Sequence, residues 1–499
     1  MKSINKIIIA VATLAMTTAM TSCNYLEIEP ENSVPEESVD FTKTEDMYQP
    51  VSGVYAAIRT KGMHWIINLM SVVRDGDVWS GRVDDQADLL TIGRKYEYNN
   101  SFWGFNEMWT QYYGIIKVAN AALVSLDSYA QYITSDADMQ KYRSYRGEVL
   151  ILRSYAYYRL CQYFGDVTIL DSNSQTDMRR STRNVVYQYV LRDLDEAARE
   201  CADSRPDQME HIGAVTRWTA KALAAKIYLN MGNYPMVETL TGEIINSGKF
   251  DLYPDFYQLF KIPGKLCEES LFECQATDFG MGSGDYVGVD QFFNCAGPNI
   301  SNQDTELKST EGWNFIGYEK SFRDWAYGRG ETIRATTSFL NAGETQPSGD
   351  LIGRNGNPDN TDCWNGKFYV PLSQFTPGRT TYGNNNNVRI LRFADVLLMN
   401  AEALVRQGKD GDTPFNRVRI RAKMPTISGV TVEQILDERR MELCCEWGER
   451  YNDLVRTGMA GSVLGPNGWT EAKTYFPIPF QQKDLAPDLN DEPYTELIY

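Results

Sequence analysis

Histidine is almost missing from this chain of 499 residues, which contains only His64 and His211. Two imidazoles so far apart in sequence exclude a histidine-based metal cluster, and a Ser-His-Asp triad would need one of these two. The chain also has no Walker lysine, and its "GMGSG" stretch lacks the preceding strand and the spacing of a dinucleotide loop. We therefore expect neither a metal site nor a nucleotide cofactor.

Cysteine is sparse as well, and the absence of a CxxC pair excludes a zinc ribbon. The cysteines are too few for a disulfide scaffold, although Cys267 and Cys274 remain one candidate bridge in an oxidising compartment. Adjacent Cys444 and Cys445 lie in a helical pattern. We interpret these two as small apolar core residues rather than as a redox pair.

Positive charge is scarce relative to negative charge, with 49 Lys and Arg against 66 Asp and Glu and a formal net charge of -17. Such a chain repels nucleic acid backbones, so no nucleic acid partner is expected. Hydrophobic residues make up 42% of the chain, enough for a large core. Aromatic residues make up 12%, more than a core alone requires, so some should be exposed for binding.

The apolar N-terminal segment stops at a single cysteine. Residues 1–22 have a basic start and the run "IIIAVATLAM", which is too short to span a bilayer and is typical of a cleaved signal peptide. Cys23 then falls at the first mature position, as in a bacterial lipoprotein, so we expect it to be acylated. The alternative is an ordinary signal peptide with an accidental cysteine. The acidic residues 23–40 predict an extended leash.

Helical periodicity dominates the rest of the chain. From Val215 to Leu229 the apolar residues step by three and four, Gly232 ends this helix, and Tyr234 begins a second one that stops at Gly248. This pattern predicts a helix hairpin of tetratricopeptide type. Similar units recur without a strict period at 118–130, 145–166, 390–409 and 414–425.

Composition divides the body of the chain into three parts. Helical periodicity governs residues 41–262 and 389–499, whereas residues 263–388 are rich in Gly, Asn, Ser and aromatic side chains. We interpret 263–388 as a loop-rich insertion on one domain, and loops on rigid scaffolds are where binding sites collect. The expected fold class is mainly α, a tetratricopeptide-like helix-hairpin scaffold with a loop-rich insertion.

One row of carboxylates suggests catalysis. Glu438, Glu442 and Glu446 recur every four residues, about 5 to 6 Å apart on one helix face, near the separation that retaining glycosidases use. A glycosidase needs its two carboxyl groups on opposite sides of the scissile bond, however, and a single helical row presents them from one side. We therefore favour a charge-paired helix face that holds neighbouring segments.

Six segments resemble those of a known family in their order along the chain. They are "WTQYYGIIKVANAAL", "LRSYAYYRLCQYFGDV", "VRILRFADVLLMNAEAL", "FNRVRIRA", "DERRMEL" and "FPIPFQQKDLAPDLND". Together with the lipoprotein cysteine, Cys23, these segments are spread over nearly the whole mature chain. On this basis the chain resembles the SusD/RagB family of outer-membrane nutrient-binding lipoproteins.

The resemblance implies a lipid-anchored protein of the outer membrane that is exposed at the cell surface and binds glycans. It also implies that the partner is a SusC-like, TonB-dependent transporter barrel. The protein would cover this barrel as a hinged lid and deliver oligosaccharides to it without catalysing a reaction. Two other functions stay open: a surface glycoside hydrolase, and a non-catalytic adhesive or structural lipoprotein.

Sugar rings offer apolar C–H faces and a rim of hydroxyls, so a site needs flat aromatic faces beside a few polar groups. Two regions with little helical period supply this mixture, residues 64–103 and the insertion, whereas Trp109 and Trp218 lie in helical series and are expected in the core. The candidate carbohydrate-binding residues are Trp65, Asp77, Trp79, Arg82, Tyr96, Trp103, Tyr286, Trp313, Asn314 and Tyr318.

Overall fold

The computed structural model describes residues 39–276, 288–298, 309–310, 312–353, 363–375 and 385–498. Within these ranges the protein is mainly helical, as the sequence predicts. The signal segment 1–22, Cys23, nearly all of the leash and Tyr286 lie outside the described residues. None of the described helices is long and apolar enough to cross a membrane.

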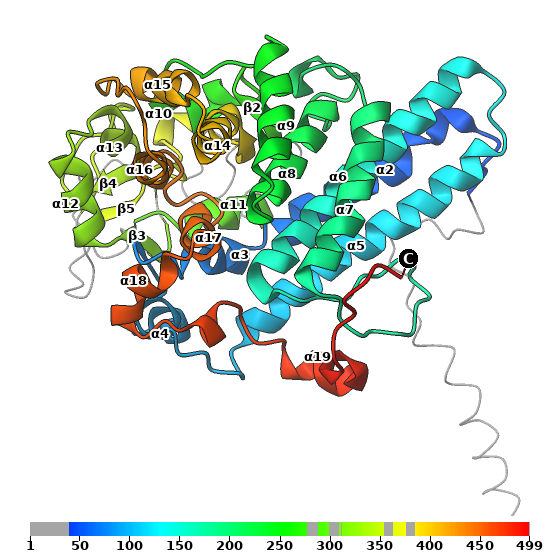
Figure 1. The fold of residues 1–499 in the computed structure, drawn as a ribbon, viewed down its shortest axis with the longest axis horizontal. Coiled ribbons are helices and arrows are strands. Elements are labelled where there is room, and N and C mark those ends of the chain that lie inside the picture. Colours follow the sequence, from blue (N-terminus) through cyan, green and yellow to red (C-terminus); the bar gives the residue numbers. More distant parts are fainter. Residues whose placement is uncertain are drawn as a thin grey trace, which may run out of the picture.

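Long antiparallel helices form one side of the molecule (Figure 1). Three of them begin at capping side chains, because Ser135, Thr216 and Asn233 accept hydrogen bonds from backbone N–H groups of the first turn. Gly232, at φ +71°, separates the predicted hairpin helices. These helices are α5 (Trp103–Ala130), α6 (Asp136–Phe164), α7 (Arg183–Glu200), α8 (Arg217–Asn230) and α9 (Tyr234–Asn246).

The C-terminal part returns to pack on these helices, with α14 next to α9. Between α16 and α17 the chain turns sharply at Gly448, which has φ +75°, and a Cβ there would meet the Ser71 carbonyl oxygen at 2.1 Å. The elements of this part are α14 (Phe393–Arg406), α15 (Asp412–Arg421), α16 (Val432–Glu442), α17 (Glu449–Arg456), α18 (Ala460–Leu464) and α19 (Phe480–Leu485).

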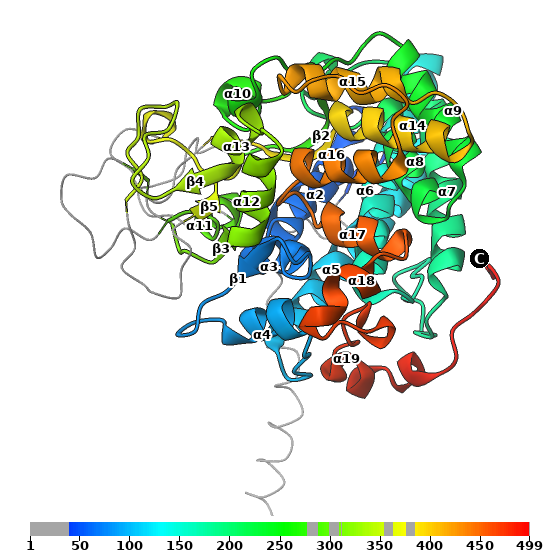
Figure 2. The same ribbon diagram turned by 60° about the vertical axis from the view of Figure 1, so that its left-hand side comes forward.

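The described part of the 263–388 insertion holds strands that the sequence did not indicate. Each of two short sheets joins strands of the insertion to a strand from the rest of the chain, and Figure 2 shows the larger sheet with α12 (Lys320–Gly328) and α13 (Ile333–Ser338) beside it. All four strands of this larger sheet are only three residues long, too short to show an alternating pattern. One sheet has the order β1 (Val78–Ser80), β3 (Ile316–Tyr318), β5 (Cys363–Asn365), β4 (Phe339–Asn341), and the other pairs β2 (Ser270–Cys274) with β6 (Val388–Arg392).

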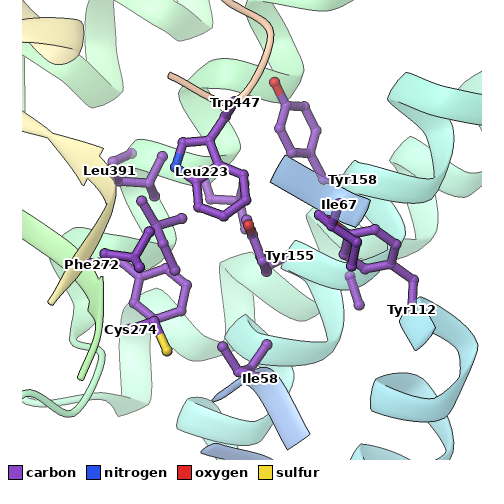
Figure 3. Packing of buried hydrophobic residues seen from close by; sticks show 14 of the residues in the cluster. Ile58, Ile67, Tyr112, Tyr155, Tyr158, Leu223, Phe272, Cys274, Leu391 and Trp447 are labelled. Atoms are coloured by element: carbon purple, nitrogen blue, oxygen red, sulfur yellow. The ribbon is translucent and has the colours of Figure 1, made fainter. Parts of the chain in front are cut away.

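The main core lies where the long helices meet β2, β6 and the C-terminal part (Figure 3). Tyr155 of α6 packs edge-on against Phe272 of β2 at 5.5 Å between ring centroids, and Trp447 approaches Tyr155 from the C-terminal part. Trp109 and Trp218 are buried in this core. The prediction that these two tryptophans are structural is confirmed.

The eight described cysteines are free thiols. Cys267 packs in a small cluster around Phe256, whereas Cys274 belongs to the main core, so the proposed bridge between them is wrong. Cys444 and Cys445 are buried in the main core, which confirms their interpretation as packing residues.

The predicted row of glutamates is buried and fully engaged in ion pairs. Glu438 lies 2.7 Å from each of Arg334, Arg329 and Arg419. Glu442 contacts Arg392 at 3.0 Å, Arg334 at 3.4 Å, and Arg421. Glu446 contacts Lys367 and Arg392. Only the first two lie on α16, because Cys445 and Trp447 have positive φ angles and end the helical register. The row therefore holds segments together, as predicted.

A second set of buried charges joins the two halves of the chain. Lys226 of α8 lies 2.9 Å from Glu449 of α17 and also pairs with Asp395 of α14. Arg439 of α16 binds Asp395 as well, and its Nε lies 2.8 Å from Asp453. We call these five residues the Lys226 network.

Candidate functional site

Three predicted tryptophans from distant parts of the chain lie together. Trp65 begins α3 (Trp65–Val72), Trp103 begins α5, and Trp313 precedes β3. The Trp65 ring centroid is 5.4 Å from that of Trp103 and 5.9 Å from that of Trp313. Phe315 stacks near Trp65 at 6.1 Å with an interplanar angle of 22°. We call these four residues the aromatic cluster.

The cluster is open to solvent on one side. Trp103 is 38% exposed, and Trp65 and Trp313 are half-buried, whereas Phe315 is buried beneath them. The Trp103 and Trp313 rings are inclined to the Trp65 ring by 53° and 87°. Their faces therefore point in different directions and do not form one flat platform.

Backbone hydrogen bonds fix the segment that carries two cluster residues. The N–H of Trp313 donates to the carbonyl of Asn294 at 2.7 Å, and the N–H of Phe315 donates to that of Cys295 at 3.0 Å. The N–H of Gly81, just after β1, donates to the Phe315 carbonyl at 2.9 Å. These bonds tie the cluster to the ends of α11 (Gly288–Asn294) and β1.

Polar groups border the aromatic cluster. The Arg82 guanidinium lies 5.9 Å from the Phe315 ring centroid, and its Nε donates to the exposed Asp84 carboxylate at 2.9 Å. The His64 ring centroid is 5.9 Å from that of Trp65, and the His64 Nε2 lies 3.9 Å from Glu107. Burial lowers the pKa of His64, and Glu107 only partly offsets this effect, so the imidazole is neutral at pH 7.

Three candidates from the first predicted region lie in the interior instead. Trp79 lies in β1 and packs against Trp364. The Tyr96 hydroxyl donates a hydrogen bond to a backbone carbonyl at 2.8 Å. The Asp77 carboxylate accepts a hydrogen bond from Arg440 at 2.8 Å. All three are buried. Their interpretation as surface residues is wrong, because polar sequence here marks a short strand and tight turns rather than an exposed loop.

Two candidates from the insertion are buried as well. Asn314 has φ +60°, and its side-chain oxygen accepts a hydrogen bond from the Trp364 indole. Tyr318 is fully buried in β3, with its hydroxyl 3.6 Å from the Cys444 sulfur. Neither side chain can present a face to a ligand. Tyr286 lies outside the described residues, so its place stays a prediction.

Sequence reasoning missed Phe315 and His64. Phe315 stands two residues after Trp313, but Asn314 between them has φ +60°, so the alternation of an extended strand does not mark it. His64 directly precedes Trp65 and caps α3, since its Nδ1 accepts from the N–H of Ile66 at 3.4 Å.

A helical hairpin scaffold that carries a partly exposed aromatic cluster with a polar border is typical of a ligand-binding protein. Residues 24–229 match the family described as "Starch-binding associating with outer membrane", and residues 230–486 match the SusD family. The chain therefore belongs to the SusD family, and the resemblance seen in its sequence is confirmed.

Individual relatives span almost the whole chain. SusD-like protein P2 of Formosa agariphila is 27% identical over 91% of this chain and 92% of its own length. A laminarin binding SusD-like protein shares the fold with a TM-score of 0.75, 25% identity and coverage of 88% and 96%. Surface glycan-binding protein A of Bacteroides thetaiotaomicron, solved with laminarihexaose, has a TM-score of 0.76, 24% identity and coverage of 90% and 98%.

Proposed function

We propose that the protein is a cell-surface lipoprotein that captures oligosaccharides on the aromatic cluster and delivers them to a TonB-dependent, SusC-like transporter in the outer membrane. The observation that carries this proposal is the convergence of Trp65, Trp103 and Trp313 at one exposed place with a polar border. Such a surface suits sugar rings, because each ring offers an apolar face and hydroxyls at its edge.

The inclination of the rings favours a bent glycan. A flat, ribbon-like chain cannot lie against Trp103 and Trp65 at once, because their planes differ by 53°. A curved chain turns successive sugar faces and can follow both. Laminarin oligosaccharides are therefore the first ligands to test, and the laminarin binding relative supports this choice.

The experiment is a calorimetric titration of the purified full-length protein with laminarin oligosaccharides, with cello-oligosaccharides of equal length as the flat comparison. We expect measurable heat for the laminarin series and at least about tenfold weaker binding for the flat series, a difference of roughly 1.4 kcal/mol. Equal affinities would contradict the preference for a bent chain.

We also expect the bound oligosaccharide to be recovered unchanged. The three glutamates that suggested catalysis are buried among arginines, and the relatives above are described as binding proteins. Product analysis by chromatography after prolonged incubation tests this expectation. Shortened products that form at a rate proportional to protein concentration would favour the glycoside hydrolase alternative.

Membrane attachment depends on Cys23 in this proposal. Cys23→Ala removes the thiol that would carry the acyl chains, and each buried methylene of such chains contributes about 0.8 kcal/mol to anchoring. We expect the variant to be lost from the outer-membrane fraction of whole cells, whereas Cys267→Ala, which changes a body cysteine, should fractionate normally. Normal retention of the Cys23 variant would contradict the lipoprotein proposal.

A further inference from the structure

A hollow of about 330 Å³ lies apart from the aromatic cluster and shares none of its residues. It is formed by α2 (Tyr48–Ala57), the π-helical turn η4 (Ile58–Gly62), the loop at His211 and the end of β2. Ile58, Phe272 and Cys274 make its apolar floor, and Figure 3 shows these three residues near one another.

Two hydrogen-bond donors of this hollow have no acceptor among the residues that the structure describes. Arg59 is half-buried, and no carboxylate or carbonyl among the described residues binds its guanidinium. The ring nitrogens of His211 likewise make no hydrogen bond within the described part of the chain. A guanidinium at the wall of a hollow that no described carboxylate binds is available for a bidentate pair with an anionic ligand.

The walls of the hollow are held in place by their own contacts. The His211 ring stacks on Tyr48 with centroids 3.3 Å apart. Tyr48 and Tyr55 donate their hydroxyls to Glu148 at 3.2 and 2.9 Å, and Gln275 donates to the carbonyl of the exposed Ile212 at 2.5 Å. The loop that carries His211 is therefore fixed on both sides.

Three carboxylates lie near the hollow, and the exposed one, Glu210 beside His211, is solvated and lies 4.0 Å from Lys141. Glu273 lines the hollow, but it accepts from Asn387 at 2.8 Å and lies 3.8 Å from Arg389. Glu148 lies buried beneath the two tyrosines, and burial raises its pKa to about 8, so it is mostly uncharged at pH 7. The lining thus offers donors and an apolar floor.

We infer that this hollow binds a hexuronic acid residue, with its carboxylate on Arg59 and His211 and its apolar ring face on Ile58 and Phe272. A carboxylate matches the planar fork of a guanidinium, and a sugar ring matches the floor. The volume suits about one or two sugar rings, at the lower end of typical ligand pockets. The choice of a sugar as the ligand rests on the proposed function, whereas the choice of an acid rests on Arg59.

The test is a titration of the full-length protein with trigalacturonic acid and with its methyl ester, which keeps the rings and removes the charge. We expect the acid to bind at least about tenfold more tightly than the ester. Arg59→Gln should weaken binding of the acid by more than about tenfold, and Arg59→Lys should weaken it less. Arg143→Gln, the same charge change at an exposed position, should leave it unaltered.

The two histidines distinguish this site from the aromatic cluster in one NMR experiment. Trigalacturonic acid should shift the ring signals of His211, and a neutral oligosaccharide held by the aromatic cluster should shift those of His64. No binding of the acid, equal binding of the ester, or an unchanged affinity in Arg59→Gln would each overturn the inference. If the protein binds trigalacturonic acid but no neutral oligosaccharide, the result would instead count against the proposed function.

Discussion

Replacing Trp103 and Trp313 together with alanine is expected to weaken oligosaccharide binding by more than about a hundredfold. Each ring presents a face beside Trp65, and truncation of a central aromatic anchor commonly costs about 2 kcal/mol or more. Each single variant should therefore weaken binding by more than about tenfold. Calorimetric titration of the full-length variants with laminarin oligosaccharides measures both effects.

Thermal unfolding of the same variants provides the control. Trp103 lies at the first turn of α5 and is 38% exposed, so its removal should barely move the unfolding temperature. Trp65 differs, because it packs against both other tryptophans and Phe315, and Trp65→Ala should reduce stability as well as binding. Full affinity in the double variant would place the glycan elsewhere on the protein.

Glu442→Gln is expected to lower the free energy of unfolding by about 3 to 5 kcal/mol at pH 7. Glu442 is fully buried and contacts Arg392, Arg334 and Arg421, and a neutral amide would leave these arginines without their shared anion. Urea unfolding at pH 7 measures the loss. Asp437→Asn, at an exposed position of the same helix, should change stability by less than about 0.5 kcal/mol.

The effect of Glu442→Gln should depend on pH. Burial has the largest influence on Glu442 and would raise its pKa, but Arg421, Arg392 and Arg334 together lower the pKa to about 2. A carboxyl group with a lowered folded-state pKa stabilises the protein fully above its unfolded value of 4.5, and this stabilisation is lost as the pH falls towards 2. The difference between wild type and variant should therefore shrink from pH 5 to pH 3. A constant difference would contradict the electrostatic explanation.

Long periodic segments could be predicted from the sequence because their signal is local. The hairpin of α8 and α9 falls where the apolar spacing and Gly232 placed it, and Trp109 and Trp218 are core residues as their helical series indicated. A helix of thirteen or more residues, such as α8 or α9, repeats its apolar spacing several times. Tertiary contacts therefore seldom change the secondary structure that such a repeated pattern predicts.

The candidate site depended on contacts that no local pattern reveals. Trp65, Trp79 and Trp103 lie in similar polar-rich sequence, yet Trp79 is covered by Trp364 and Leu340 from the insertion while Trp103 is not. Which aromatic residue is covered depends on strand pairing across more than 200 residues of sequence, such as Trp79 with Gly317. Composition could indicate the region, but it could not distinguish the exposed rings from the buried ones.

The Lys226 network has a consequence for how the chain can be divided and for when it can fold. The two family matches meet at residues 229 and 230, one helical turn after Lys226 and at the end of α8. A fragment cut there would keep the buried ammonium group and lose both of its carboxylate partners, Asp395 and Glu449. The ion pairs around Lys226 are therefore complete only once the chain has been made as far as α17.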